Sequence, residues 1–186
     1  MLILASASPR RRELLTQLGC SFEVVVSATD ECSDESLSPE ELTLRNATQK
    51  ALAVAKLRPE APVLGADTVV ALDGHIYGKP RDEAAAIDML KKLVGKEHLV
   101  ITGIALAHRG KVYTDAVTTK VAMAPLTEAA IKKYVATGEP LDKAGAYAVQ
   151  GKAAAFITGI VGSFSNVVGL PLHTVCTLAE TAGVAL

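Results

Sequence analysis

The order of apolar and polar positions along the chain predicts alternating strands and helices. Short apolar runs rich in β-branched residues predict strands at 2–5, 22–26, 63–72, 75–77, 99–107, 112–123 and 156–161. Apolar positions that recur every three or four residues predict helices at 9–18, 39–56, 82–93, 126–138 and 171–181. The segment 27–38 is rich in Ser, Asp and Glu, and we expect it to form a loop.

Pairs of residues mark where several of these elements begin or turn. Ser8-Pro9 and Ser38-Pro39 each combine a favourable N-cap with a favourable first helical residue, so each predicts a helix start. Asp73-Gly74 predicts a tight hairpin, and Arg109-Gly110 joins the long strands predicted at 99–107 and 112–123. Alternating strands and helices with several hairpins predict an α/β fold with a mixed sheet.

Length and composition narrow the class of protein. A chain of 186 residues suits one domain, or one domain with two lobes around a cleft. Apolar residues make up 49% of the chain. A chain of this size buries roughly 70% of its unfolded surface, so we expect a folded core. The 19 Lys and Arg nearly cancel the 20 Asp and Glu. Nucleic-acid binders usually carry a basic excess, so nucleic acid is not an expected partner.

The chain also lacks the patterns of several other classes. No apolar stretch approaches the roughly 20 residues of a membrane helix, so we expect no membrane segment. The three cysteines (Cys20, Cys32 and Cys176) are odd in number and far apart, which favours neither a disulfide framework nor a zinc site. The four histidines lack ligand spacing as well. These features favour a cytoplasmic protein.

The segment from Ser6 to Arg12 joins a predicted strand to a predicted helix. Helix N-termini offer N–H groups and the positive end of the helix dipole, and these bind anions. Arg10 and Arg11 lie in the first helical turn, where cations cost the helix about 0.3–1 kcal/mol. A bound polyanion explains that cost better than a structural purpose does. A solvated basic turn on a surface helix is the alternative that this segment alone leaves open.

Asp67 interrupts a nearly continuous apolar strand pattern over Val63–Val70. Aspartate is depleted in strands, and a carboxylate placed there must be paired, coordinated or protonated. One interpretation is a general base or metal ligand held rigidly by the sheet. The other is a buried salt bridge to a lysine.

Further charged residues come from loops and from one helix. The rigid turn Gly78-Lys79-Pro80 fixes a point charge suited to a phosphate oxygen, and Lys143 follows in a later loop. Lys50 lies on the polar side of a predicted helix, a pattern more typical of an ordinary exposed lysine. Mg²⁺ is usually held by one or two carboxylates plus substrate phosphates, and Glu31 or Asp30 in the acidic loop could join Asp67 in that task.

Common nucleotide and hydrolase motifs are missing. The chain has no G-x-x-x-x-G-K-[ST] loop, no G-x-G-x-x-G fingerprint and no G-x-S-x-G elbow. Ser163 and Asn166, near Pro171, could orient a ligand or cap a turn, and we favour the structural role. What remains is arginine and lysine together with Asp and Glu, which favours a polyphosphate site without an amino-acid nucleophile.

Taken together, eight short motifs resemble the Maf family of nucleoside triphosphate pyrophosphatases. They occur in the family's order over nearly the whole chain, and eight in register are far more specific than one. The matching segments are 6–11 (SASPRR), 30–31 (DE), 49–51 (QKA), 65–68 (GADT), 78–80 (GKP), 138–147 (GEPLDKAGAY), 150–151 (QG) and 166–171 (NVVGLP).

The resemblance implies a single domain over 1–186 with an inosine-triphosphatase-like α/β fold, a mixed twisted sheet, flanking helices and two lobes around a cleft. It implies a divalent cation, Mg²⁺ or Mn²⁺, a nucleoside triphosphate substrate and a homodimer. The family's proton acceptor corresponds to Asp67, which with Glu31 also lies on the metal side. Substrate-binding and specificity positions correspond to Arg10, Thr68, Gln150, Ser6, Arg11, Lys50 and Lys79.

Within the family, the motifs resemble the branch that acts on dTTP and UTP. We therefore expect hydrolysis to the nucleoside monophosphate and pyrophosphate, with modified pyrimidine nucleotides as further candidate substrates. The chain departs from the family pattern at two places, neither of which touches the proposed acid–base group: Ala148-Val149 stands next to Gln150 where Gly-Ile is common, and Phe164 lacks the hydroxyl of the Tyr that is frequent there. The alternatives are a non-enzymatic nucleotide- or nucleic-acid-binding regulator of cell division, and a phosphatase that removes the terminal phosphate.

Overall fold

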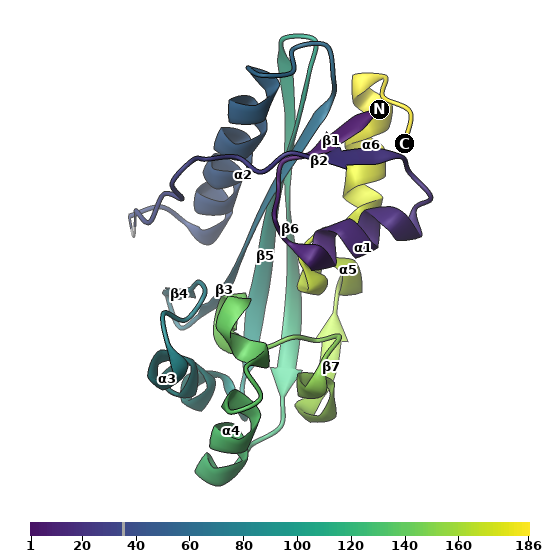
Figure 1. Ribbon diagram of the computed structural model, residues 1–186. Coiled ribbons are helices and arrows are strands. Elements are labelled where there is room, and N and C mark those ends of the chain that lie inside the picture. Colours follow the sequence, from purple (N-terminus) through teal and green to yellow (C-terminus); the bar gives the residue numbers. More distant parts are fainter. Residues whose placement is uncertain (35) are drawn as a thin grey trace. The chain divides into compact units, whose positions relative to one another are not determined.

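The computed structural model describes residues 1–34 and 36–186 (Figure 1). Glu35, in the loop expected at 27–38, lies outside the described residues. The strands are β1 Leu2–Leu4, β2 Phe22–Val24, β3 Val63–Leu72, β4 His75–Tyr77, β5 Glu97–His108, β6 Lys111–Met123 and β7 Ile157–Val161. The helices are α1 Pro9–Gln17, α2 Pro39–Ala55, α3 Glu83–Leu93, α4 Glu128–Val135, α5 Phe164–Val168 and α6 Leu172–Ala182. Three short 3₁₀ helices cover Glu139–Asp142, Ala144–Ala146 and Lys152–Phe156.

Every strand and helix expected from the pattern is present, with small differences at the ends. The second strand is shorter than expected and ends at Val24. α5 and the three 3₁₀ helices were not predicted, because such short elements carry no apolar repeat. Both proline-started helices are confirmed, and α2 adds a capping box in which the side chains of Ser38 and Glu41 each accept a backbone N–H of the other.

The strands that the structure describes form one mixed seven-stranded sheet in the order β2-β1-β3-β5-β6-β7, with β4 paired to β3. β1 runs parallel to β2 and to β3, with Ile3 opposite Glu23 and Val63. β4 and β7 pair antiparallel to β3 and β6, respectively. The expected mixed α/β fold is therefore confirmed. None of the helices in the described part of the chain is long and apolar enough to span a bilayer.

Two tight turns join neighbouring strands at the expected dipeptides. Asp73 and Gly74, between β3 and β4, have φ of 51° and 77°, and Arg109 and Gly110, between β5 and β6, have φ of 49° and 75°. Positive φ at both central residues is what a type I′ hairpin requires, and Gly and Asp tolerate it well. These two dipeptides therefore determine where the β3–β4 and β5–β6 hairpins turn.

The chain divides into two compact units, and each is described by itself. The first comprises 1–67, 102–117 and 169–186, and the second comprises 68–101 and 118–168. In the first unit, α2 packs on β1, β3 and β5 through a cluster that includes Ala47, Ala51, Val63 and Ala105. Close approach is possible because Gly65 and Gly103 face α2, where a Cβ would collide with the backbone of Ala47 and Thr43, respectively.

The second unit has its own core, in which α3 and α4 pack beside β5 and β6. The two helices lie next to each other in Figure 1. Leu90 and Leu93 of α3 and Ile131 of α4 are almost fully buried. The Tyr134 and Phe156 rings meet edge to face at 5.1 Å. Tyr77 and Tyr147, which precede the loops of Lys79 and Gln150 in the chain, both pack in this cluster.

Candidate active site

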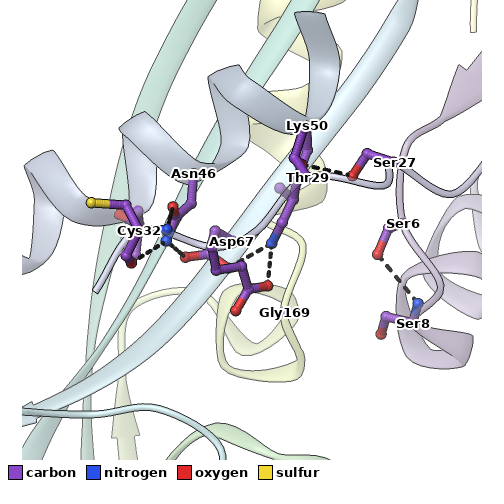
Figure 2. Close-up of polar contacts among 12 residues, drawn as sticks. Ser6, Ser8, Ser27, Thr29, Cys32, Asn46, Lys50, Asp67 and Gly169 are labelled. Carbon is purple, nitrogen blue, oxygen red and sulfur yellow. Dashed lines mark hydrogen bonds and ion pairs between the residues drawn. The ribbon is translucent and has the colours of Figure 1, made fainter. Parts of the chain in front are cut away.

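Asp67 lies near the middle of β3 and is 7% exposed. Asn46 donates its side-chain N–H to Asp67 Oδ2 at 3.0 Å, and Lys50 Nζ donates to Oδ1 at 2.9 Å. Figure 2 shows both side chains pointing from α2 towards the carboxylate. An ionised carboxylate can remain buried only when it is paired and hydrogen-bonded, and both conditions are met here.

Lys50 contacts a second carboxylate. Its Nζ donates to Glu31 Oε1 at 2.6 Å, so one ammonium joins Glu31 to Asp67. Lys50 is 8% exposed, which corrects the expectation that it lies on the polar, exposed side of its helix. Thr43, Asn46 and Lys50 all lie on a buried face of α2, because residues three, four and seven apart share one face. The salt bridge foreseen as an alternative for Asp67 is present, as part of a larger network.

Asn46 was not identified from the sequence. It is 3% exposed and, besides its bond to Asp67, it contacts the peptide of Cys32 twice. The Cys32 N–H donates to Asn46 Oδ1 at 2.8 Å, and Asn46 Nδ2 donates to the Cys32 carbonyl at 3.2 Å. The signal in the sequence was the spacing of Asn46 and Lys50, which stand four residues apart and are followed directly by the apolar residues Ala47 and Ala51 of the same helix face.

The segment that begins at Ser6 lies in the same unit. Ser6 is buried, and its Oγ accepts the N–H of Ser8 at 3.2 Å, as drawn in Figure 2. The Ser8 side chain makes no capping bond to α1. The Ser6 hydroxyl also accepts from Arg11 Nη1 at 3.2 Å. The loop before α1 is therefore fixed by Ser6 and not by the predicted N-cap side chain.

Arg11 ties three segments of the first unit together. Its Nη1 donates to the Ala66 carbonyl at 2.9 Å, and its Nε donates to the Gly169 carbonyl at 2.8 Å. Burial lowers the pKa of the Arg11 guanidinium, while the Asp67 carboxylate raises it. Arg11 thus lies directly beside the strand residue that precedes Asp67. The interpretation of this segment as a solvated surface turn is wrong for Ser6 and Arg11, and Arg10 is half-buried.

The remaining predicted residues belong to the second unit. Thr68 follows Asp67 in β3 and is half-buried, whereas Lys79 and Gln150 are exposed in loops. The Gly78 carbonyl accepts the Gly145 N–H at 3.1 Å, which connects the loop of Lys79 to the 3₁₀ helix at 144–146. The structure therefore gathers Ser6, Arg11, Glu31, Lys50 and Asp67 in one unit and gives Thr68, Lys79 and Gln150 to the other.

Gln150 sits in a turn that Glu139 and Tyr134 hold. Glu139 accepts from the Tyr134 hydroxyl at 2.8 Å, the Lys152 N–H at 3.0 Å and the Ala153 N–H at 3.4 Å. Burial raises the pKa of Glu139, but these hydrogen bonds outweigh it and the net shift is downward. The Tyr134 hydroxyl also accepts the Ala148 N–H at 3.3 Å. Both sides of the turn are thereby anchored.

Three further polar residues form hydrogen bonds within the second unit: Lys143, Ser163 and Asn166. Lys143 Nζ donates to the Glu139 carbonyl and to Asp142 Oδ1, each at 2.6 Å. The Ser163 hydroxyl accepts the Asn166 N–H at 3.2 Å at the start of α5. Asn166 is fully buried and donates to the Val100 carbonyl at 3.0 Å. These contacts agree with the structural role favoured for both residues: Ser163 caps the start of α5, and the Asn166 side chain bonds to β5.

The chain is similar to known proteins over almost its whole length. The model of the Maf family, described as Maf-like protein, matches residues 1–182. The dTTP/UTP pyrophosphatase of Symbiobacterium thermophilum is 52% identical over 172 residues, which cover 92% of this chain and 89% of that protein. The dTTP/UTP pyrophosphatase of Gloeobacter violaceus is 53% identical over 171 residues, covering 92% and 90%. That of Thermococcus kodakarensis is 47% identical over 182 residues, covering 97% and 96%. With the whole-chain match and these identities, the chain belongs to the Maf family.

Proposed function

We propose that this protein hydrolyses pyrimidine nucleoside triphosphates, dTTP and UTP, to the monophosphate and pyrophosphate. The observation that carries the proposal is the buried Asp67 carboxylate, held at both oxygens by Asn46 and Lys50, close to Glu31 and next to the Ala66 carbonyl that Arg11 contacts. The substrate class is supported by relatives about half identical to this chain that bear the name dTTP/UTP pyrophosphatase.

The reaction needs a general base and cationic groups that stabilise the negative charge developing on the phosphate oxygens. A water oxygen attacks the α-phosphorus, the bond from that phosphorus to the bridging oxygen breaks, and pyrophosphate leaves. Asp67 accepts the proton of the water, as a positioned carboxylate can. Because Asn46 and Lys50 already hold the Asp67 carboxylate in place, that carboxylate needs little reorganisation during the reaction. Arg10, Arg11, Lys50 and Lys79 are the proposed cations that offset charge on the phosphate oxygens.

A divalent cation, Mg²⁺ or Mn²⁺, is part of the proposal, and the residues present fit one. The carboxylates of Glu31 and Asp67 converge on a single cationic atom, Lys50 Nζ, at 2.6 and 2.9 Å. Mg²⁺ sites commonly use one or two carboxylates plus substrate phosphates. Within 1–34 and 36–186, no group of three or more His, Cys, Asp or Glu side chains forms a metal cage. When bound, the cation would supply positive charge to the phosphates, with Glu31 and Asp67 as its protein ligands.

We further propose that Thr68 and Gln150 recognise the pyrimidine edge, with Arg10 contributing to substrate choice. A glutamine amide offers both a donor and an acceptor, which suits a pyrimidine carbonyl and its neighbouring N–H. The exposure of Gln150 in an anchored turn supports this role, since a base reader must be accessible and fixed.

The test is the replacement Asp67→Asn, which keeps the size of the side chain and removes the base. We expect turnover of dTTP and UTP to fall by several orders of magnitude, roughly 10²–10⁴-fold for lost base catalysis alone. Pyrophosphate release and nucleotide products are measured together with the melting temperature. Asp115→Asn, at an exposed aspartate of β6 in the same unit, is the matched control and should keep full activity.

The products separate the alternatives. Monophosphate and pyrophosphate support the proposal, orthophosphate and diphosphate indicate a phosphatase, and no product with any metal indicates a binding protein without catalysis. Full activity in a folded Asp67→Asn protein would refute the role of Asp67. A panel of canonical and modified nucleoside triphosphates identifies the preferred base.

A further inference from the structure

The side-chain amide of Asn46 is buried between the Asp67 carboxylate and the backbone of Cys32 (Figure 2). It makes three hydrogen bonds to two separate segments. Nδ2 donates to Asp67 Oδ2 at 3.0 Å and to the Cys32 carbonyl at 3.2 Å, while Oδ1 accepts the Cys32 N–H at 2.8 Å. One amide therefore joins β3 to the loop that carries Glu31.

The position of this amide is set by the helix that carries it. Asn46 and Lys50 stand one turn apart on α2, so they reach the two oxygens of the same carboxylate from successive turns. The helix lies close to the sheet because Gly65 and Gly103 present no side chain to it. Asn46 is thus held by rigid elements, which is how precise sites are supported.

We propose that Asn46 is a positioning residue, which orients the Asp67 carboxylate and fixes the adjacent Glu31 loop in one arrangement before substrate binds. The inference rests on the proposed function for its catalytic consequence. Its structural part, the anchoring of the Cys32 peptide, does not depend on any substrate.

The chemistry of an amide explains why this residue type is required. The site needs an acceptor for the Cys32 N–H and a donor for both the Cys32 carbonyl and Asp67 Oδ2. Aspartate would supply only acceptors and would add a second negative charge beside Asp67. Leucine has a similar size but would leave these buried groups without that partner, which costs stability as well as geometry.

The experiment compares Asn46→Ala and Asn46→Leu with the control Thr43→Val. Thr43 is fully buried on the same face of α2, and its hydroxyl donates to the Pro39 and Glu40 carbonyls of its own helix. Both Asn46 variants should lower kcat for dTTP by roughly 10–100-fold, the usual effect of losing a partner that orients a ligating side chain. KM measured at saturating metal should change by less than about threefold, because the amide contacts the reacting carboxylate and the Cys32 backbone and is not itself proposed to contact substrate. Thr43→Val should leave both constants near those of the unaltered protein.

A double-mutant cycle tests whether Asn46 acts through Asp67. In an Asp67→Asn background, the Asn46→Ala change should lower the residual activity by less than about twofold, since residues that act as a unit are not additive. An undiminished loss in that background, or an equal loss of kcat in Thr43→Val, would overturn the inference.

A second readout needs no activity and no metal. Cys32 is partly exposed, Cys20 is buried and Cys176 is exposed, so a Cys176→Ser background leaves Cys32 as the main site for iodoacetamide. Asn46→Ala should raise its alkylation rate in the metal-free protein by at least about tenfold, because the loop loses its anchor and opens more often. Unchanged alkylation together with unchanged kcat overturns the proposal. If the unaltered chain releases no pyrophosphate, the proposed function fails alone and the alkylation rate still decides the anchoring.

Discussion

His98, at the start of β5, is buried in the second unit at 1% exposure. Its Nε2 lies 2.8 Å from the Tyr147 hydroxyl, and the two rings meet edge to face at 5.4 Å. Burial lowers the pKa of His98 to about 4, because the charged imidazolium loses its hydration there. The same burial raises the pKa of the Tyr147 hydroxyl. The pair is therefore neutral at physiological pH.

This neutral histidine should make stability depend on pH. In the unfolded chain the pKa of His98 returns to about 6.5, so the unfolded state binds more protons between the two values. The contribution of neutral His98 to the free energy of unfolding is fully present above pH 6.5 and is lost as the pH falls through about 4. We expect roughly 2–3 kcal/mol less unfolding free energy at pH 4.5 than at pH 7.5 from this group. Urea denaturation at the two pH values measures this difference in unfolding free energy, which should be smaller in His98→Gln. Equal pH dependence in both proteins contradicts this role, and His75→Gln, at an exposed histidine, is the control.

Some residues of the candidate site can be predicted from local sequence pattern, whereas others become apparent only from the tertiary packing. Asp67 was predictable as a site residue because a carboxylate in an apolar strand must be paired, coordinated or protonated. The structure places it in a buried hydrogen-bonded network. Lys50 and Asn46 were misjudged or missed because a polar side chain in a helix is ordinarily taken as exposed. Only the packing of α2 on the sheet shows that they face inwards. Long-range partners such as Gly169 for Arg11 cannot be read from local pattern.

At the scale of elements, the turn that carries Gln150 depends on groups outside it. The Glu139 carboxylate accepts three hydrogen bonds and lies so close to Gly151 that a Cβ there would collide with it. The turn is closed by the Gly151 N–H, which donates to the Ala148 carbonyl at 3.0 Å. The 3₁₀ helix at 139–142 and α4 therefore shape the turn through Glu139 and Tyr134.

We predict that Glu139→Gln loosens this turn. A glutamine would replace one acceptor oxygen with a donor that faces a backbone N–H, which should cost about 1–3 kcal/mol. Under the proposed role of Gln150, the ratio of kcat/KM for dTTP over dCTP should fall, by roughly tenfold for about 1.4 kcal/mol of lost discrimination. Steady-state kinetics and chemical denaturation measure the two effects. Glu128→Gln, at an exposed glutamate of α4, should change neither by more than about 0.5 kcal/mol. Unaltered selectivity in Glu139→Gln alongside altered selectivity in Gln150→Ala would show that Glu139 does not position the turn.

The elements themselves were largely predictable from pattern. Long apolar repeats gave α2, α3, β5 and β6 within a few residues, and positive-φ dipeptides located both hairpins. No helix or strand was predicted between residues 139 and 155, where the structure has 3₁₀ helices. These 3₁₀ turns arise from Gly138 and Gly145 at φ of 75° and 69° and from side-chain bonds such as that of Glu139, which no periodic pattern encodes.

At the scale of the whole molecule, the boundary between the two compact units falls within β3, because Asp67 ends a segment of the first unit and Thr68 begins a segment of the second. The homodimer implied by the family resemblance stays a prediction, which the mass in solution tests against 19.4 kDa for one chain.

Nucleotide binding should stabilise the whole chain, and it should need the metal. A ligand at 100 times its dissociation constant adds about 2.7 kcal/mol, which for a chain of this size raises the melting temperature by roughly 5–10 °C. We expect this shift with a non-hydrolysable dTTP analogue plus Mg²⁺ or Mn²⁺, and a much smaller one with EDTA. Glu31→Gln should need more metal for the same shift, because one proposed ligand loses its charge. Differential scanning fluorimetry measures both, and an equal shift with EDTA would contradict the proposed metal requirement.

The contact of α2 with Gly65 and Gly103 has a consequence for protein engineering. Replacing glycine with alanine commonly adds about 0.4–1 kcal/mol of stability where the backbone permits it. Neither of these glycines has a positive φ, so a choice based on backbone angles alone would accept both. Alanine at either position would collide with α2 and shift the helix that carries Asn46 and Lys50. Gly159 in β7, where a Cβ would meet the Ala122 Cβ at an ordinary 3.9 Å, is the safer choice for a stabilised enzyme.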